Sequence, residues 1–179
     1  PTGDPRRTTR IPEELLSEQV QRLAVFATVA GGLWTFGLLM DVAILPVVNG
    51  TGLRNWRSIP VEIAAAVVSF VFCFWVRRSS ASLAAKTNAG LGFMLLNAVG
   101  IATLNAWASV PPQPNEIHIS WITVLILVYS MIAPSSPRRM LLASLVAAAM
   151  DPAAFAVAAL AGFETPSPVV VLVMSWPNV

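Results

Sequence analysis

Long uninterrupted runs of apolar residues recur along this chain, and they constrain its fold more than any other feature. A run of about 20 such residues crosses a bilayer as an α-helix, because a helix satisfies its own backbone hydrogen bonds in lipid. The pattern predicts five full spans and the beginning of a sixth. Their predicted bounds are 23–45, 59–76, 88–110, 117–133 and 140–161, with a partial span at 168–179.

The composition excludes the main alternatives to a membrane protein. Of the 179 residues, 56% are hydrophobic and only 11% are charged, whereas a soluble domain averages about 25% charged residues. Disorder is excluded by the same apolar content. One cysteine excludes a disulfide framework and any multi-cysteine metal site. The predicted fold class is therefore all-α, an integral membrane helix bundle.

The basic residues predict the orientation of this bundle, because cytoplasmic loops carry an excess of Lys and Arg. Nine of the eleven basic residues fall on one predicted side, and only Arg54 and Arg57 fall on the other. The N-terminus is therefore expected in the cytoplasm. Arginines at helix ends face anionic headgroups, so the pI of 9.4 does not indicate a nucleic-acid partner. The nine are Arg6, Arg7, Arg10, Arg22, Arg77, Arg78, Lys86, Arg138 and Arg139.

The first 22 residues are predicted to form a cytoplasmic segment, followed by a transmembrane domain over 23–179. Pro12, Glu13 and Glu14 are typical of a first helical turn. The apolar residues that follow up to Leu23 share one face, which predicts a short amphipathic helix. A plain extension of the first membrane helix explains the pattern equally well. The apolar run is too long and begins too late for a cleavable signal peptide.

Asp151 is the most costly residue in the predicted membrane interior. A carboxylate at mid-span costs at least about 2.5 to 3.5 kcal/mol on insertion scales, so it should face protein or water. A functional interpretation makes it a proton or ligand site together with Asn97 or Asn105. A structural interpretation starts from Pro152, which cannot donate to the carbonyl of Ala148. The helix would then break, and Asp151 would cap its second half.

Other polar residues carry weaker signals. Asp41 and Glu62 lie near the outer ends of the first two spans, where they either form a polar cluster with Arg54 or Arg57 or are simply solvated. His118 is expected at the outer interface, and it lacks a second histidine for bis-imidazole haem ligation.

Cys73 is expected to be a buried apolar thiol, and Asn49-Gly50-Thr51 to be a turn rather than a glycosylation site. Rows of Gly and Ala in three spans, such as Ala98, Ala102 and Ala106, indicate close helix packing, either within a compact bundle or against transmembrane helices of a partner. The sequence contains no HExxH, no GxSxG and no phosphate-binding glycine loop. No catalytic residue, metal site or cofactor is therefore expected in this chain.

The order of segments resembles a known architecture. The stretch PEELLSEQVQRL at 12–23 leads into the first span, and Ile119-Ser120-Trp121 opens a helix that closes with Pro134-Ser135-Ser136-Pro137-Arg138-Arg139 before an Ala-rich fifth span. This layout resembles the N-terminal polytopic membrane region of bacterial serine/threonine protein kinases. The resemblance implies the bacterial inner membrane and a cytoplasmic kinase domain further along the polypeptide.

This chain itself contains no glycine-rich kinase loop, no HRD and no DFG, so no kinase residue is carried over. We expect the polypeptide either to continue beyond Val179 or to end in a half-inserted tail, and favour the former.

Two functions compete. The first is a non-catalytic membrane domain that anchors and senses or dimerises. The alternative is an accessory structural subunit of a large respiratory or photosynthetic membrane complex. A transporter has least support, since no internal repeat is evident.

Overall fold

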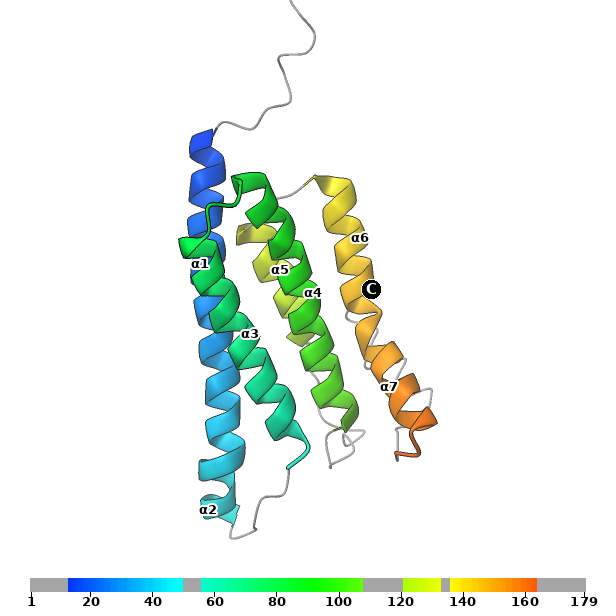
Figure 1. Ribbon diagram of the computed structural model, residues 1–179. Helices are drawn as coiled ribbons and strands as arrows, with labels where there is room; N and C mark the ends of the chain where they lie inside the picture. The colour runs from blue at the N-terminus through cyan, green and yellow to red at the C-terminus, as the bar shows by residue number, and fades with distance from the viewer. Residues whose placement is uncertain (1–12, 50–55, 108–120, 133–135, 164–179) are drawn as a thin grey trace, which may run out of the picture.

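The computed structural model describes residues 13–49, 56–107, 121–132 and 136–163, and all regular elements in these ranges are helices. The helices lie side by side as a bundle (Figure 1). The all-α class predicted from the apolar runs is thus confirmed. The elements are α1 (Glu13–Leu39), the π-helical turn η1 (Met40–Ile44), α2 (Leu45–Asn49), α3 (Ser58–Arg78), α4 (Leu83–Trp107), α5 (Trp121–Ile132), α6 (Pro137–Ala148) and α7 (Met150–Leu160).

Four helical stretches in the described ranges are long and apolar enough to cross a membrane: Ser17–Val48, Ser58–Arg78, Leu83–Trp107 and Pro137–Leu160. The helix α5 has 12 residues, or about 18 Å at 1.5 Å per residue, which is shorter than a bilayer core of about 30 Å. The rest of the predicted span 117–133 lies outside the described residues, and so does the partial span 168–179.

Residues 13–22 and most of the predicted first span form one continuous helix, α1. Gln21 and Arg22 are exposed and Leu23 is buried, whereas the side chains of residues 13–16 lie outside the described ones. The helix then widens into η1, where Leu45 N–H donates to the carbonyl of Met40. Pro46 explains this π-turn, because its ring has no N–H and would clash with the carbonyl of Val42 in a regular helix.

Two further boundaries differ from the sequence-based ranges. The helix α4 begins at Leu83, five residues before the predicted start at 88, because Ser82 caps it: the Ser82 hydroxyl accepts from Ala85 N–H at 3.2 Å. The predicted span 140–161 is two helices, α6 and α7, separated at Ala149. The break predicted from Pro152 is therefore present. Ala149, and not Asp151, is the N-cap residue of α7.

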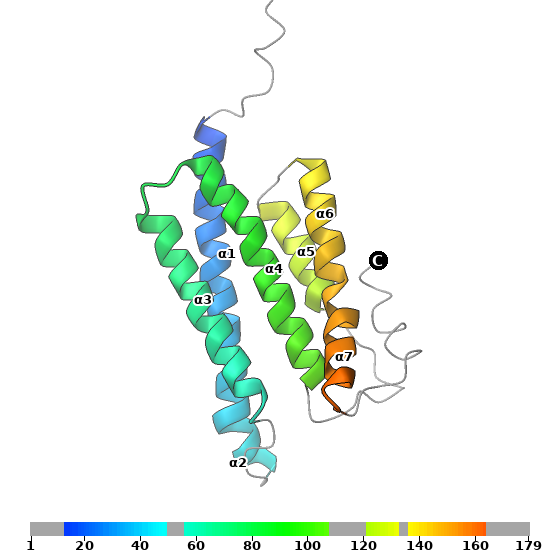
Figure 2. The same ribbon diagram turned by 45° about the vertical axis from the view of Figure 1, so that its right-hand side comes forward.

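The helix α4 is the central element of the bundle. It packs against α1, α3, α5, α6 and α7, while α1 and α3 form the most extensive helix pair. Figure 2 shows α1 and α3 on one side of α4 and α5 and α6 on the other.

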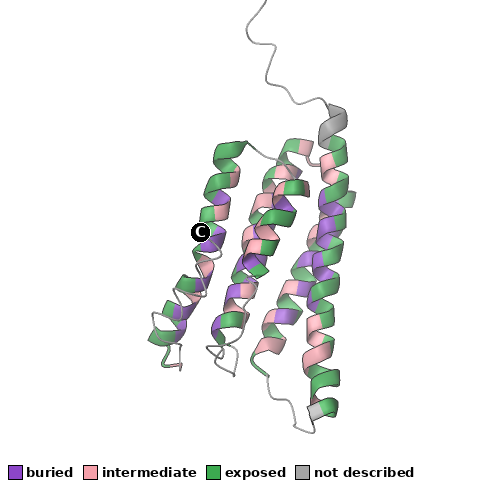
Figure 3. Ribbon diagram, turned by 180° about the vertical axis from the view of Figure 1, so that it is seen from behind, coloured by how far each residue is buried: buried purple, intermediate pink, exposed green. Residues whose placement is uncertain are grey.

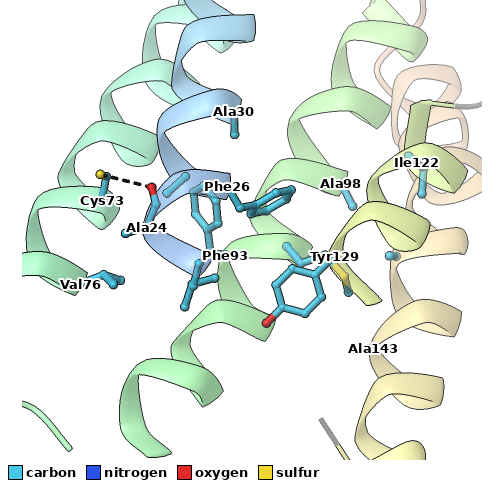
Figure 4. Close-up of a cluster of buried hydrophobic side chains, with 14 of the residues drawn as sticks. Ala24, Phe26, Ala30, Cys73, Val76, Phe93, Ala98, Ile122, Tyr129 and Ala143 are labelled. Atoms are coloured by element: carbon cyan, nitrogen blue, oxygen red, sulfur yellow. Dashed lines mark hydrogen bonds between the residues drawn. The ribbon is translucent and has the colours of Figure 1, made fainter. Parts of the chain in front are cut away.

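Aromatic rings fill the core between these helices (Figure 4). Phe26 makes edge-to-face contacts with Phe93 at 5.9 Å and with Tyr129 at 5.8 Å between ring centres. Phe72 stacks on Phe93 at 4.4 Å. Small residues such as Ala27, Ala98 and Ala147, none of which is accessible, let the backbones approach closely.

The outer faces of the helices are apolar. Exposed residues run along every helix (Figure 3), and large apolar side chains are prominent among them. Examples are Leu33, Phe36, Val71, Phe74, Leu142 and Val157. Exposed apolar area on this scale suits contact with lipid, because a soluble monomer rarely leaves such patches uncovered.

The described basic residues gather at one end of the bundle. Arg22 lies near the start of α1, Arg77 and Arg78 in the last turn of α3, Lys86 in the first turn of α4, and Arg138 and Arg139 at the start of α6. These helix ends lie together at the top of Figure 1. We call it the basic end. The other end carries α2, the start of α3 and the end of α4, and its described basic residue is Arg57.

Candidate functional site

A cavity lined mostly by polar side chains lies between η1, the start of α3 and the end of α4. Its volume is about 270 Å³. We call it the acidic cavity, because two carboxyl groups contribute to its wall. The lining residues are Asp41, Arg57, Ser58, Val61, Glu62, Thr103, Leu104, Asn105 and Trp107.

Local helix geometry brings the acidic residues of this cavity together. Asp41 lies in the π-helical turn that Pro46 imposes. Ser58 and Glu62 are four residues apart in the first two turns of α3, so they share one face. The hydroxyl of Ser58 donates to the carboxylate of Asp41, which joins the start of α3 to η1.

Glu62 is the most unusual residue of the acidic cavity. Its side chain is 5% exposed, and its Oε2 atom has no hydrogen-bond partner. Gly37 allows the carboxyl group to lie against the backbone of α1, since a β-carbon at Gly37 would be only 3.2 Å from Oε1 of Glu62. A buried carboxyl oxygen without a partner costs free energy. Binding of a proton or a small cation to this carboxyl group would therefore lower the free energy of the folded protein.

Arg57 lines the cavity without neutralising either carboxyl group. No ion pair joins it to Asp41 or Glu62 in the part of the chain that the structure describes. Its guanidinium carbon instead lies 4.8 Å from the ring centre of Phe163 and 5.7 Å from that of Trp56. Asp41 and Glu62 thus line one cavity, in agreement with the cluster interpretation, and no pairing with Arg57 is present among the described residues. Arg54 lies outside the described residues.

Asp151 and Asn105, two of the three predicted site residues, are in contact. Asn105 Nδ2 donates to Asp151 Oδ1 at 3.1 Å. Asp151 is 6% exposed and lies in the first turn of α7, where its charge complements the helix dipole. Because Asn105 also lines the acidic cavity, it connects the buried carboxylate of α7 to the wall of that cavity.

Asn97, the third predicted site residue, belongs to a different contact. Its Oδ1 atom accepts from Trp34 Nε1 at 2.8 Å, and its Nδ2 atom donates to the carbonyl of Phe93 at 2.9 Å. Asn97 is eight residues before Asn105, which corresponds to about 12 Å along the helix. Its pairing with Asp151 is not found. It ties α4 to α1 through the buried indole of Trp34.

The remaining sequence candidates fall into two groups. Cys73 is buried, and its thiol donates to the carbonyl of Ala24 at 3.5 Å (Figure 4), as expected of a structural cysteine. His118, Gly50 and Thr51 lie outside the described residues. Among the residues that are described, no group of three or more His, Cys, Asp or Glu side chains is arranged to hold a metal ion.

The two hydroxyl groups in the cavity wall, those of Ser58 and Thr103, were not predicted from the sequence. The spacing of Ser58 four residues before Glu62 was a usable signal, because it places both on one face of a helix. Thr103 carried none, since a Thr in a membrane helix usually bonds to its own backbone, and Thr103 Oγ1 does donate to the carbonyl of Val99 at 2.7 Å. Comparison of the chain with protein-family models, curated proteins and solved structures found no match.

Proposed function

We propose that this chain is a non-catalytic integral membrane domain that anchors in the bilayer and senses protons or small cations through the acidic cavity. The observation that carries the proposal is Glu62, a buried carboxyl group with an unpartnered oxygen in the wall of a cavity. Filling this site changes the contacts among η1, α3 and α4. A change in the occupancy of the acidic cavity is therefore expected to alter the packing of the bundle.

In this proposal the chain crosses a bacterial inner membrane five times and begins a sixth crossing at 168–179, and α5 belongs to the span 117–133. The apolar outer faces and the four long helices support the anchoring role. The gathering of basic residues at one end supports a cytoplasmic location of that end. The acidic cavity then faces the outside, where a sensor of ions or pH meets its signal.

The role also fits the kinase-like layout that residues 12–23 and 119–139 resemble. In such a receptor the membrane domain transmits the state of its outer site to a cytoplasmic enzyme. The spans contribute no catalysis, which is consistent with the absence of kinase motifs from this sequence.

The sensing role is tested by thermal unfolding of the purified protein in detergent between pH 4 and 9, with and without NaCl. A ligand that binds only the folded state raises the unfolding midpoint. We expect the midpoint to depend on proton or Na⁺ concentration, and Glu62→Gln to remove most of this dependence while the protein stays folded. The matched control is Glu18→Gln, because Glu18 is exposed and pairs with Arg22 at the basic end at 2.5 Å. An equal dependence in wild type and Glu62→Gln, or none in wild type, contradicts the proposal.

Purification of the protein from its native membranes distinguishes the sensor from the accessory-subunit alternative. A sensor domain is expected alone, as a homo-oligomer or as part of a longer signalling polypeptide. Stoichiometric recovery with haem or pigment subunits of a larger complex would instead favour the accessory subunit.

A further inference from the structure

A second cavity lies at the basic end of the bundle, far from the acidic cavity. It is enclosed by the start of α1, the end of α3 and the start of α4, and its volume is about 400 Å³. We call it the basic cavity. It is lined by Ser17, Val20, Gln21, Ala24, Val25, Val76, Arg77 and Lys86.

Lys86 is the residue that makes this cavity a candidate site. Its side chain is 8% exposed, although a lysine is almost never fully buried unless it is paired. Within the described residues no ion pair and no side-chain hydrogen bond involves its ammonium group. A positive charge held in a cavity without a partner favours the binding of an anion.

The charges around the basic cavity reinforce this preference. Arg77 adds a second cation to its wall. The described acidic residue in the facing part of α1 is Glu18, whose carboxylate is already bound to Arg22 at 2.5 Å. Arg78 points elsewhere, with its guanidinium carbon 5.6 Å from the ring centre of Phe74. The cavity therefore holds two cations, Arg77 and Lys86, that no described carboxylate neutralises.

The donor set matches a phosphate group. A guanidinium binds two phosphate oxygens at once, an ammonium supplies a compact charge, and an amide such as that of Gln21 adds a neutral donor. The cavity lies beside the last turn of α3 and the first turn of α4, at the level where a membrane helix meets lipid headgroups. Basic pockets between membrane helices at this depth bind anionic headgroups.

We propose that the basic cavity binds a phosphate group through Lys86 and Arg77, either in the headgroup of an anionic phospholipid or as a soluble phosphate. The site is independent of the acidic cavity, because it uses other helix ends and opposite charges. It would make the packing of α1, α3 and α4 at the basic end depend on an anion bound there.

The test uses the full chain purified in a maltoside detergent, which contains no phosphate. Short-chain phosphatidylglycerol is titrated in one arm and inorganic phosphate in the other, with the thermal unfolding midpoint as readout and native mass spectrometry as a count of bound molecules. We expect a saturable rise of the midpoint with one molecule bound. Lys86→Gln and Arg77→Gln should each weaken the apparent affinity about tenfold, as the loss of one charge-assisted contact implies.

Arg78→Gln is the matched control, because it removes a neighbouring cation outside the cavity. Saturation by the phospholipid alone identifies a headgroup site, and saturation by both ligands shows that the phosphate group suffices. Lys86→Gln removes the charge of a buried side chain and introduces no new charge. Should Lys86→Gln fail to fold, Arg77→Gln serves as the second variant, because Arg77 is exposed. The proposal is overturned when neither ligand raises the midpoint, or when Arg78→Gln weakens binding as much as the two cavity variants.

Discussion

Two adjacent glycines in α1, Gly31 and Gly32, have opposite surroundings. A β-carbon at Gly31 would lie 2.9 Å from Cε1 of Phe70 in α3, whereas a β-carbon at Gly32 would have no other atom within 4 Å. Gly31 therefore permits the close approach of α1 and α3, the most extensive helix pair of the bundle. Gly32 faces outward and makes no such contribution. The sequence pattern grouped both as small residues and did not separate them.

Gly31→Ala is expected to destabilise the protein by about 1–3 kcal/mol, because the added methyl group forces the ring of Phe70 to move. Gly32→Ala is expected to be neutral or to stabilise by up to about 1 kcal/mol, since alanine is the better helix former. The free energy of unfolding in mixed micelles measures both effects. Equal values for the two variants would show that Gly31 does not mediate the contact between α1 and α3.

At the scale of elements, the break between α6 and α7 decides where Asp151 lies. Pro152 removes one backbone donor, and the helix restarts at Met150 after Ala149. The helix α7 then packs along α4, while α6 contacts both α4 and α5. The hydrogen bond from Asn105 to Asp151 fastens α7 to the end of α4.

Asp151→Ala is expected to lower the free energy of unfolding by about 1 kcal/mol, because the amide of Asn105 loses this acceptor. Asp151→Asn should cost less, since its side-chain oxygen still accepts. Unfolding measurements on Asp151→Ala, Asn105→Ala and the double variant form a thermodynamic cycle. A non-zero coupling energy is expected from the direct contact. Strictly additive effects would mean that the bond does not contribute to stability.

The elements also show where sequence patterns lose accuracy. Hydropathy located α3 to within two residues of its predicted bounds, 59–76. It missed the earlier start of α4, because Lys86, Thr87 and Asn88 interrupt the apolar run there and the start is set by the Ser82 cap. It also missed η1, because a proline that widens a helix instead of ending it leaves no trace in the apolar pattern.

At the scale of the whole molecule, the charged residues are divided between two ends with different chemistry. The basic end carries Lys86 and most of the described arginines, whereas Asp41 and Glu62 meet in the acidic cavity at the other end. The positive-inside rule then predicts that the basic end is cytoplasmic. Residues at the two ends should differ in their access to reagents that do not cross the membrane.

Single-cysteine labelling with an impermeant maleimide on intact cells tests this orientation. The only native cysteine, Cys73, is buried, so background labelling should be low. Trp56→Cys, near the acidic cavity, is expected to react from outside, and Ser80→Cys, between α3 and α4, only after permeabilisation. Both native residues are exposed, so burial does not account for a difference. The reverse labelling pattern would show that the protein has the opposite orientation in the membrane.

The sequence by itself determined the all-helical class, the approximate limits of the long apolar helices and the separation of basic residues from Asp41 and Glu62. These properties follow from local hydropathy and from the helix end at which a residue lies. Both can be read directly from the order of residues along the chain. Only the tertiary structure decided which polar side chains meet. It separated Asn97 from Asp151, left a carboxyl oxygen of Glu62 buried without a partner, placed Lys86 in the wall of the basic cavity, and turned Arg57 toward aromatic rings. Such contacts depend on helix rotation and on breaks at Pro46 and Ala149, where one residue of shift turns a side chain by about 100°.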